Sequence, residues 1–264
     1  MAARGVSFNH VGHPESSISK VLVSGLSGAN AVDLLNENIS ICGWMRIKGN
    51  QGDAGPRGNT VFSFFTDNSQ LNDDLEWQSS NSAFGSSPFN MWGQHSQNFT
   101  QTFVSGTGNI VATNEDWFYA LSYASSTGVI TYMVGKDGAT SLSTFNSGAI
   151  VWDGTSILTI FMIGATCVDV NRGNNTEHLN YKIWKRIFTP TEMLAEMKSV
   201  NPVISTGLWA HYKLESSTDL TDYSGNSRTL ESKGTPGNGT MDPVDLQTPA
   251  AGGGVVWRGL SIRH

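Results

Sequence analysis

Apolar and polar residues alternate along several stretches of this chain with a period of two, which is typical of half-buried β-strands. The clearest stretch is 39–47 (ISICGWMRI), whose apolar face carries Ile39, Ile41, Met45 and Ile47. The same pattern predicts strands at 60–65, 117–123, 129–135, 179–187 and 207–214. Residues 156–164 are apolar on both faces and predict a central strand. A Ser-Ser-Thr-Gly turn at 125–128 joins two of these strands and predicts a β-hairpin.

One helix is predicted at about 189–198. Its start combines Thr189 as N-cap, Pro190 in the first helical position and Glu192 three residues after the cap. Phe188 and Met193 have the spacing of a hydrophobic staple. The apolar stripe of this helix, which includes Met193, predicts packing onto the core.

Polar, glycine-rich segments separate the predicted strands at 49–59, 66–90 and 171–178. Residues 66–90 form a long segment without a strand pattern, and loops of that length are usually functional or partly disordered. We expect three parts: an N-terminal arm (1–18), a β-domain (19–232) and a Gly/Pro-rich C-terminal tail (233–264). Deletion of residues 233–264 is expected to leave a folded domain but to abolish assembly.

Many strands with one helix predict an all-β, two-sheet antiparallel sandwich. Composition supports this class, because only 14% of the 264 residues are charged and Gly, Ser, Thr and Asn are abundant. The net charge of −6 without a basic cluster argues against nucleic acid and anionic lipid as partners. The N-terminus lacks the apolar core of a signal peptide, so we expect a protein that is made in the cytoplasm and either stays there or leaves by lysis or a dedicated assembly route.

Cys42 and Cys167 both lie in strand-like apolar runs. A pair of buried thiols is favoured over a disulfide, because nothing in the sequence indicates an oxidising compartment.

Four segments resemble the concanavalin A-like (laminin G-like) lectin superfamily. They are 28–44, the Trp-containing hairpin at 117–138, LNYKIWKRIFTPTEMLAEM at 179–197, and 207–230 with its Asp-Tyr-Ser-Gly-Asn element. The resemblance covers about 20–232 and implies a jelly roll of two curved sheets, often calcium-bearing and often sugar-binding. Similar domains without a signal peptide occur on tailed bacteriophages, which implies a place on a virion or particle surface.

Enzymes of that superfamily carry Glu-x-Asp-x-x-Glu or Glu-x-Asp-x-x-x-Glu on one strand, which places the carboxylates on one face. Neither motif is present in this sequence. The nearest carboxylate cluster, 72–76, is assigned to a solvated loop. We therefore expect a protein that is not an enzyme.

Two binding sites are considered. Calcium prefers clustered oxygen ligands, and Asp219, Asp222 and Asn226 offer them; the alternative is a turn in which these side chains bond the backbone. Sugar binding needs aromatic rings beside amides or carboxylates. The candidates gather in or beside the 66–100 region, where the alternative is local core under a loop: Trp77, Phe89, Trp92, His95 and Asn98.

Two hypotheses of function follow. The first is a non-enzymatic virion structural or decoration protein that binds other particle subunits through its two ends, with a homo-oligomer as one form of that assembly. The second is a carbohydrate-binding host-attachment (fibre) module, and the two can coexist in one protein. A glycoside hydrolase is the third alternative, disfavoured by the missing carboxylate motif.

Overall fold

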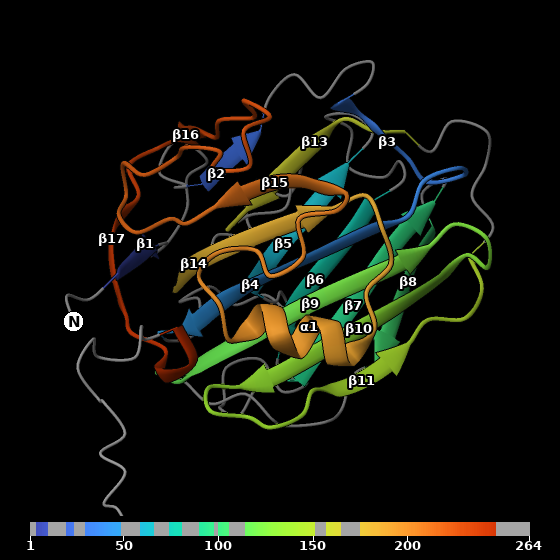
Figure 1. Cartoon of the computed structure of the whole chain (residues 1–264), viewed down its shortest axis with the longest axis horizontal. Coiled ribbons are helices and arrows are strands. Elements are labelled where there is room, and N and C mark those ends of the chain that lie inside the picture. Colours follow the sequence, from blue (N-terminus) through green and yellow to red (C-terminus); the bar gives the residue numbers. More distant parts are fainter. Residues whose placement is uncertain are drawn as a thin grey trace, which may run out of the picture.

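In the part of the chain that the structure describes, the protein is a sandwich of two antiparallel β-sheets with one α-helix outside (Figure 1). A computed structural model describes residues 4–9, 20–23, 30–48, 59–65, 74–80, 90–97, 100–105, 114–150, 157–164 and 175–246. The predicted all-β, antiparallel jelly-roll class with one short helix is confirmed.

The eight-stranded sheet has the order β11-β10-β9-β4-β14-β1-β17, with β15 also paired to β14. Its strands are β1 (Arg4–Asn9), β4 (Ile39–Ile47), β9 (Asp116–Ala124), β10 (Val129–Lys136), β11 (Ser143–Asn146), β14 (Asn175–Trp184), β15 (Leu208–Tyr212) and β17 (Gly237–Met241). The predicted hairpin is the β9–β10 pair, in which Val129 lies opposite Ala124.

The seven-stranded sheet has the order β16-β2-β13-β5-β6-β7-β8. Its strands are β2 (Lys20–Val23), β5 (Asn59–Phe65), β6 (Asp74–Ser80), β7 (Asn90–Gln97), β8 (Thr100–Ser105), β13 (Ile160–Ile163) and β16 (Glu231–Lys233). A separate ribbon pairs β3 (Val32–Asp33) with β12 (Ile157–Leu158), and a 3-10 turn, η3 (Val244–Leu246), follows β17.

Strand β4 is buried on both faces, although its alternation predicted burial of one. Ile39, Ile41, Met45 and Ile47 enter the core between the sheets, as expected. Trp44 and Cys42 point the other way and pack in a second apolar cluster with the helix residues Met193 and Met197. The helix therefore adds a third layer that turns the predicted polar face into a second core. Cys42 is a free, buried thiol whose pKa burial raises to about 12; Cys167 lies outside the described residues.

The helix α1 (Pro190–Met197) begins as predicted. The Thr189 hydroxyl accepts from the backbone N–H of Glu192 at 3.2 Å, and the Glu192 carboxylate accepts from the N–H of Thr189 at 2.8 Å. This capping box satisfies two backbone donors that the first turn leaves free. Phe188 and Met193 are both buried in the second cluster.

Strand β14 contains a bulge that sets which side chains enter the core. Asn180 and Tyr181 together oppose the single residue Gly43 on β4, and Asn180 has φ = 55°. The extra residue reverses the alternation, so Tyr181 faces the inter-sheet core and Lys182 faces α1. A Cβ on Gly43 would lie 2.7 Å from the Tyr181 ring, so the bulge requires glycine there.

Both chain ends differ from the predicted arm and tail. Within the segment expected to be an arm, β1 pairs with β14 and β17. Within the segment expected to be a tail, β17 is the last strand of the eight-stranded sheet, and Met241 and Leu246 are buried; β16, which ends at Lys233, pairs with β2 at the boundary of that segment. Sequence composition missed these strands because Gly237 and Gly239 interrupt the apolar pattern; a Cβ on Gly239 would lie 2.9 Å from the backbone of Gly5.

We therefore predict that removal of 233–264 destabilises the domain. The deletion removes Met241 and Leu246, whose burial contributes roughly 1.5–3 kcal/mol each, and uncovers the apolar residues of the second cluster that they pack against. In denaturant unfolding, the chain without 233–264 should have a free energy of unfolding several kcal/mol lower than a chain truncated after Leu246, which keeps both elements. Equal stability of the two truncated chains would contradict the packing of β17.

Candidate functional site

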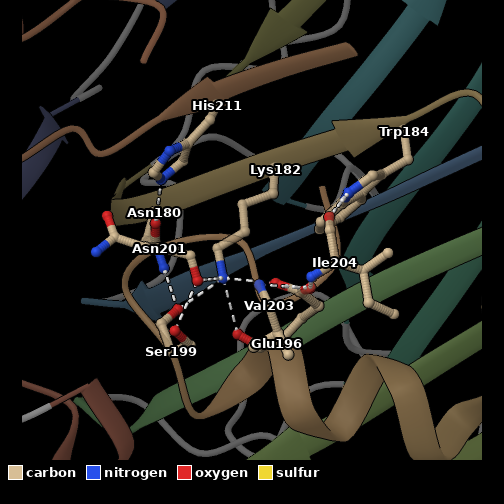
Figure 2. A network of polar contacts seen from close by, with 9 residues as sticks. All are labelled: Asn180, Lys182, Trp184, Glu196, Ser199, Asn201, Val203, Ile204 and His211. Atoms are coloured by element: carbon tan, nitrogen blue, oxygen red, sulfur yellow. Dashed lines mark hydrogen bonds and ion pairs between the residues drawn. The ribbon is translucent and has the colours of Figure 1, made fainter. Parts of the chain in front are cut away.

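A buried ion pair lies between α1 and the eight-stranded sheet (Figure 2). Lys182 comes from β14 and Glu196 from the last turn of α1, and their Nζ and Oε2 atoms are 2.9 Å apart. Both side chains are 0% exposed. Buried charges persist only when other hydrogen bonds replace the lost water.

Those hydrogen bonds come from the backbone of α1 and the following loop. The Lys182 ammonium also donates to the carbonyl oxygens of Ser199 at 2.6 Å and Glu196 at 3.0 Å. The other Glu196 oxygen, Oε1, accepts from the N–H groups of Val203 at 2.9 Å and Ile204 at 2.8 Å. The ammonium thus has an acceptor for each of its three donors, and both charges are compensated.

Three further contacts fasten the same loop to the sheet. The Trp184 indole donates to Ile204 O at 2.8 Å, and the Asn180 amide donates to Ser199 O at 3.1 Å. His211 Nε2 lies 3.1 Å from Asn180 Oδ1, which extends the network to β15. Figure 2 shows these side chains converging on the loop from one face of the sheet. The arrangement is a structural clamp, and sequence reasoning missed it because Lys182 lay within an ordinary strand pattern.

A second buried polar group lies inside the inter-sheet core. His178 has Thr176 Oγ1 at 2.8 Å from Nε2 and Tyr181 Oη at 2.8 Å from Nδ1, and its ring packs against Phe8 at 5.2 Å. Burial lowers the pKa of His178 to about 3, so the ring is neutral at ordinary pH. Both ring nitrogens have hydroxyl partners within the fold, which indicates a structural histidine.

A third cluster joins β4, β9, β14 and β17. Arg46 makes a two-point contact with Asp116, at 2.6 and 2.9 Å. Glu177, fully buried, lies 2.8 Å from Lys48 Nζ and accepts from the Thr240 hydroxyl at 3.1 Å. This cluster anchors the C-terminal strand to the sheet.

The turn after β15 contains the predicted calcium ligands. Asp222 accepts from the backbone N–H groups of His211, Ser224 and Arg228 at 2.9–3.0 Å. Burial acts to raise the pKa of Asp222, but these donors outweigh it and hold the pKa below its usual value. Asn226 donates to Trp209 O, and Asp219 accepts from Glu215 N and the Tyr223 hydroxyl. These side chains form hydrogen bonds within the turn and with the adjoining strand, as in the predicted alternative to a calcium site. Calcium binding at this turn stays a prediction.

The predicted sugar-binding residues fall on a set of strands where a loop was expected. Residues 74–80 form β6, so the carboxylate positions Asp74 and Glu76 lie in a strand, contrary to our assignment. Trp77 is in β6, and Trp92 and His95 are in β7. Phe89 and Asn98 lie outside the described residues. The strand was missed because DLEWQSS is mostly polar. Its alternation contains only two apolar residues, Leu75 and Trp77, which are too few for a recognisable apolar face.

The register places the aromatic positions on two different faces. Trp77 pairs with Phe62 and with Gly93, and His95 belongs to the row of Phe64. Since Phe62 and Phe64 are buried between the sheets, the rows of Trp77 and His95 belong to the core face. Trp92 pairs with Gln78, one step along the strand, and therefore belongs to the outer face.

The outer rows of β6–β8 combine aromatic and polar residue types. One row runs Glu76, Gln94, Phe103; the next runs Gln78, Trp92, Ser105. The positions of Trp92 and Phe103 are thus diagonal neighbours on adjacent strands. We call these six positions the outer rows. Phe103 was not among our candidates, since only the register connects 103 with 92.

The comparisons with known proteins concern the fold. No protein-family model matches the sequence, and neither does any curated protein. Tailspike protein 2 of an Escherichia coli bacteriophage has a TM-score of 0.53 at 12% identity, with 81% of this chain and 30% of that chain covered. Its enzymatically active domain, from bacteriophage CBA120, gives 0.55 at 13% identity, covering 80% and 32%.

A SAP-like pentraxin of Limulus polyphemus gives a TM-score of 0.51 at 11% identity, with 88% of this chain and 96% of that chain covered. The chain thus spans about a third of the tailspike and nearly the whole pentraxin. These likenesses establish a jelly-roll fold. Among the described residues, no helix is long and apolar enough to cross a membrane.

Removal of either partner of the Lys182–Glu196 pair should destabilise the fold. Because the remaining charge is left buried without its partner, Lys182→Met and Glu196→Gln should each lower the free energy of unfolding by roughly 3–5 kcal/mol. In the double variant the loss should be smaller than the sum. The control is Lys136→Met, which breaks an exposed pair with Glu115 and should cost at most about 1 kcal/mol. Additive losses at 182 and 196 would contradict the coupling.

Because of His178, the free energy of unfolding should decrease as the pH falls. Its pKa is about 3 when folded against a reference of 6.5, so the unfolded chain binds a proton first as pH falls. Its stabilising contribution is complete above pH 6.5 and is lost progressively toward pH 3. Between pH 6 and 5, His178→Gln should reduce the slope of unfolding free energy against pH by up to about 1.4 kcal/mol per unit. An unchanged slope would mean that His178 is solvated in the native state.

Proposed function

We propose that the protein is a non-enzymatic, carbohydrate-binding jelly-roll domain of a virion or comparable particle. The observation that carries this proposal is the composition of the outer rows. Aromatic rings stack on sugar faces while amides and carboxylates bond hydroxyls, and Trp92 and Phe103 alternate there with Gln78, Gln94 and Glu76. Ser63, which begins the Glu76 row on β5, is buried, so the proposed surface is limited to β6–β8.

The rest of the described surface offers little else for a sugar to stack on. Tyr223, 46% exposed, is the aromatic residue with a large exposed fraction in the described part of the chain. The Lys213 ammonium already lies 4.5 Å from its ring centroid, and its hydroxyl donates to Asp219. This ring is engaged within the protein, which favours the outer rows.

A non-catalytic role is supported by how the buried ionisable groups are used. Lys182, Glu196, His178 and Asp222 each have short contacts with the protein that account for their burial. Polar groups committed in this way stabilise the fold and are poor candidates for proton transfer to a substrate. The shared fold with a phage tailspike supports placement on a particle, with attachment through neighbouring subunits.

Binding to a glycan array, with and without EDTA, tests the proposal. We expect wild-type binding, and a loss of about tenfold or more in affinity for Trp92→Ala, since 1.4 kcal/mol of stacking corresponds to tenfold. Tyr223→Ala is the matched control and should bind as wild type does. Loss of glycan binding in EDTA would show that binding requires calcium, whereas glycan binding that persists in EDTA would show that it does not.

Absence of binding in both conditions would overturn the glycan proposal and leave the particle-structural role alone. Equal losses for Trp92→Ala and Tyr223→Ala would show that the outer rows are not the site.

A further inference from the structure

Two segments of the chain contain no Lys, Arg, Asp or Glu: residues 77–114 and 138–152. Charged residues make up 14% of the whole sequence, so these are long neutral intervals. Strands β7 and β8 lie within the first interval, and β11 lies within the second. Charge is thus excluded from strands far apart in the sequence.

The fold brings these neutral strands to one side of the sandwich. In the described part of the chain, β8 is the last strand of the seven-stranded sheet and β11 the last of the eight-stranded sheet. The opposite ends, β16 and β17, are joined by residues 234–236 and so lie together. Figure 1 shows β8 and β11 on the other side of the molecule.

The two sides are protected differently. Near β17, Arg4 lies 3.9 Å from Glu215, and Arg46 reaches the backbone of Thr240. Monomeric proteins block open sheet edges with charges, prolines or bulges, because an unpaired strand recruits another strand. The β11 interval 138–152 contains neither charge nor proline.

Strand β11 is held in a geometry that can accept a further strand. The Phe145 ring stacks on Tyr132 at 5.1 Å and 12°, which fixes β11 on β10. Ser147 N–H donates to Ile130 O at 2.9 Å. Because hydrogen-bonding direction alternates along an antiparallel strand, the backbone N–H and C=O groups of Thr144 and Asn146 point away from β10. Both residues are exposed.

We infer that β11 is a self-association edge, which pairs antiparallel with β11 of a second copy about a two-fold axis. Such pairing is self-complementary, since Thr144 of one copy meets Asn146 of the other in both directions. Each chain carries a net charge of −6, so two copies repel each other. The neutral intervals minimise this repulsion on the side of β11, which favours the approach of a second copy there. The continuous sheet would extend from β17 of one copy to β17 of the next.

Sedimentation velocity of the full chain tests this inference. The strand is only four residues long, so we expect a reversible dimer with a dissociation constant between roughly 1 µM and 1 mM. Thr144→Lys places a charge on the edge of each copy and should raise the dimer dissociation constant at least tenfold. Asn238→Lys, on the exposed edge strand β17, is the matched control and should dimerise as wild type does.

Thermal unfolding of each variant checks that the fold is retained. If Thr144→Lys is unfolded, Asn146→Lys replaces it, because Asn146 is exposed on the same edge. A wild-type chain that stays monomeric over the whole range overturns the inference. So does a dimer that Asn238→Lys disrupts and the β11 variants leave intact.

Discussion

The bulge in β14 is the constraint on which the rest of the structure depends. A regular strand would turn Lys182 into the apolar space between the sheets, where a charge cannot be solvated. The extra residue at Asn180–Tyr181 turns the lysine outward and brings a tyrosine inward beside His178. The bulge is possible because Asn180 tolerates positive φ and Gly43 leaves room for the tyrosine ring. One local irregularity thus decides the contents of both faces of the sheet.

The outward lysine in turn determines how the helix is attached. Lys182 and Glu196 neutralise each other, and the backbone of residues 199–204 satisfies their remaining hydrogen-bonding groups. Apolar packing through Met193 and Met197 holds the helix against the same face. Packing supplies the attraction, whereas the polar clamp allows a single position of helix and loop. This face is therefore filled by the protein's own structure.

The seven-stranded sheet differs in character. Its inner positions on β5 enter the shared core, whereas the outer rows of β6–β8 combine aromatic and amide residues without a lysine or arginine. The neutral strands β8 and β11 lie on the same side of the molecule. A pair of molecules joined there would carry two outer-row surfaces, and two weak sites in one particle bind more tightly than either alone.

Local patterns in the sequence determined the elements whose signals are contained within one segment. Alternation predicted β4 and the β9–β10 hairpin, and the spacing of Thr189, Pro190 and Glu192 predicted the start of α1, because capping and turn chemistry act over three or four residues. Only the tertiary structure decided which polar residues are buried together. Packing of α1 on the sheet brings Glu196 to Lys182, whereas strand pairing brings Arg46 to Glu177 and β1 to β17. Sequence spacing encodes neither kind of contact. The same holds for the candidate surface: Trp77 and Trp92 looked equivalent in sequence, and the register alone separated a core position from an outer one, since a shift of one residue exchanges the two faces of a strand.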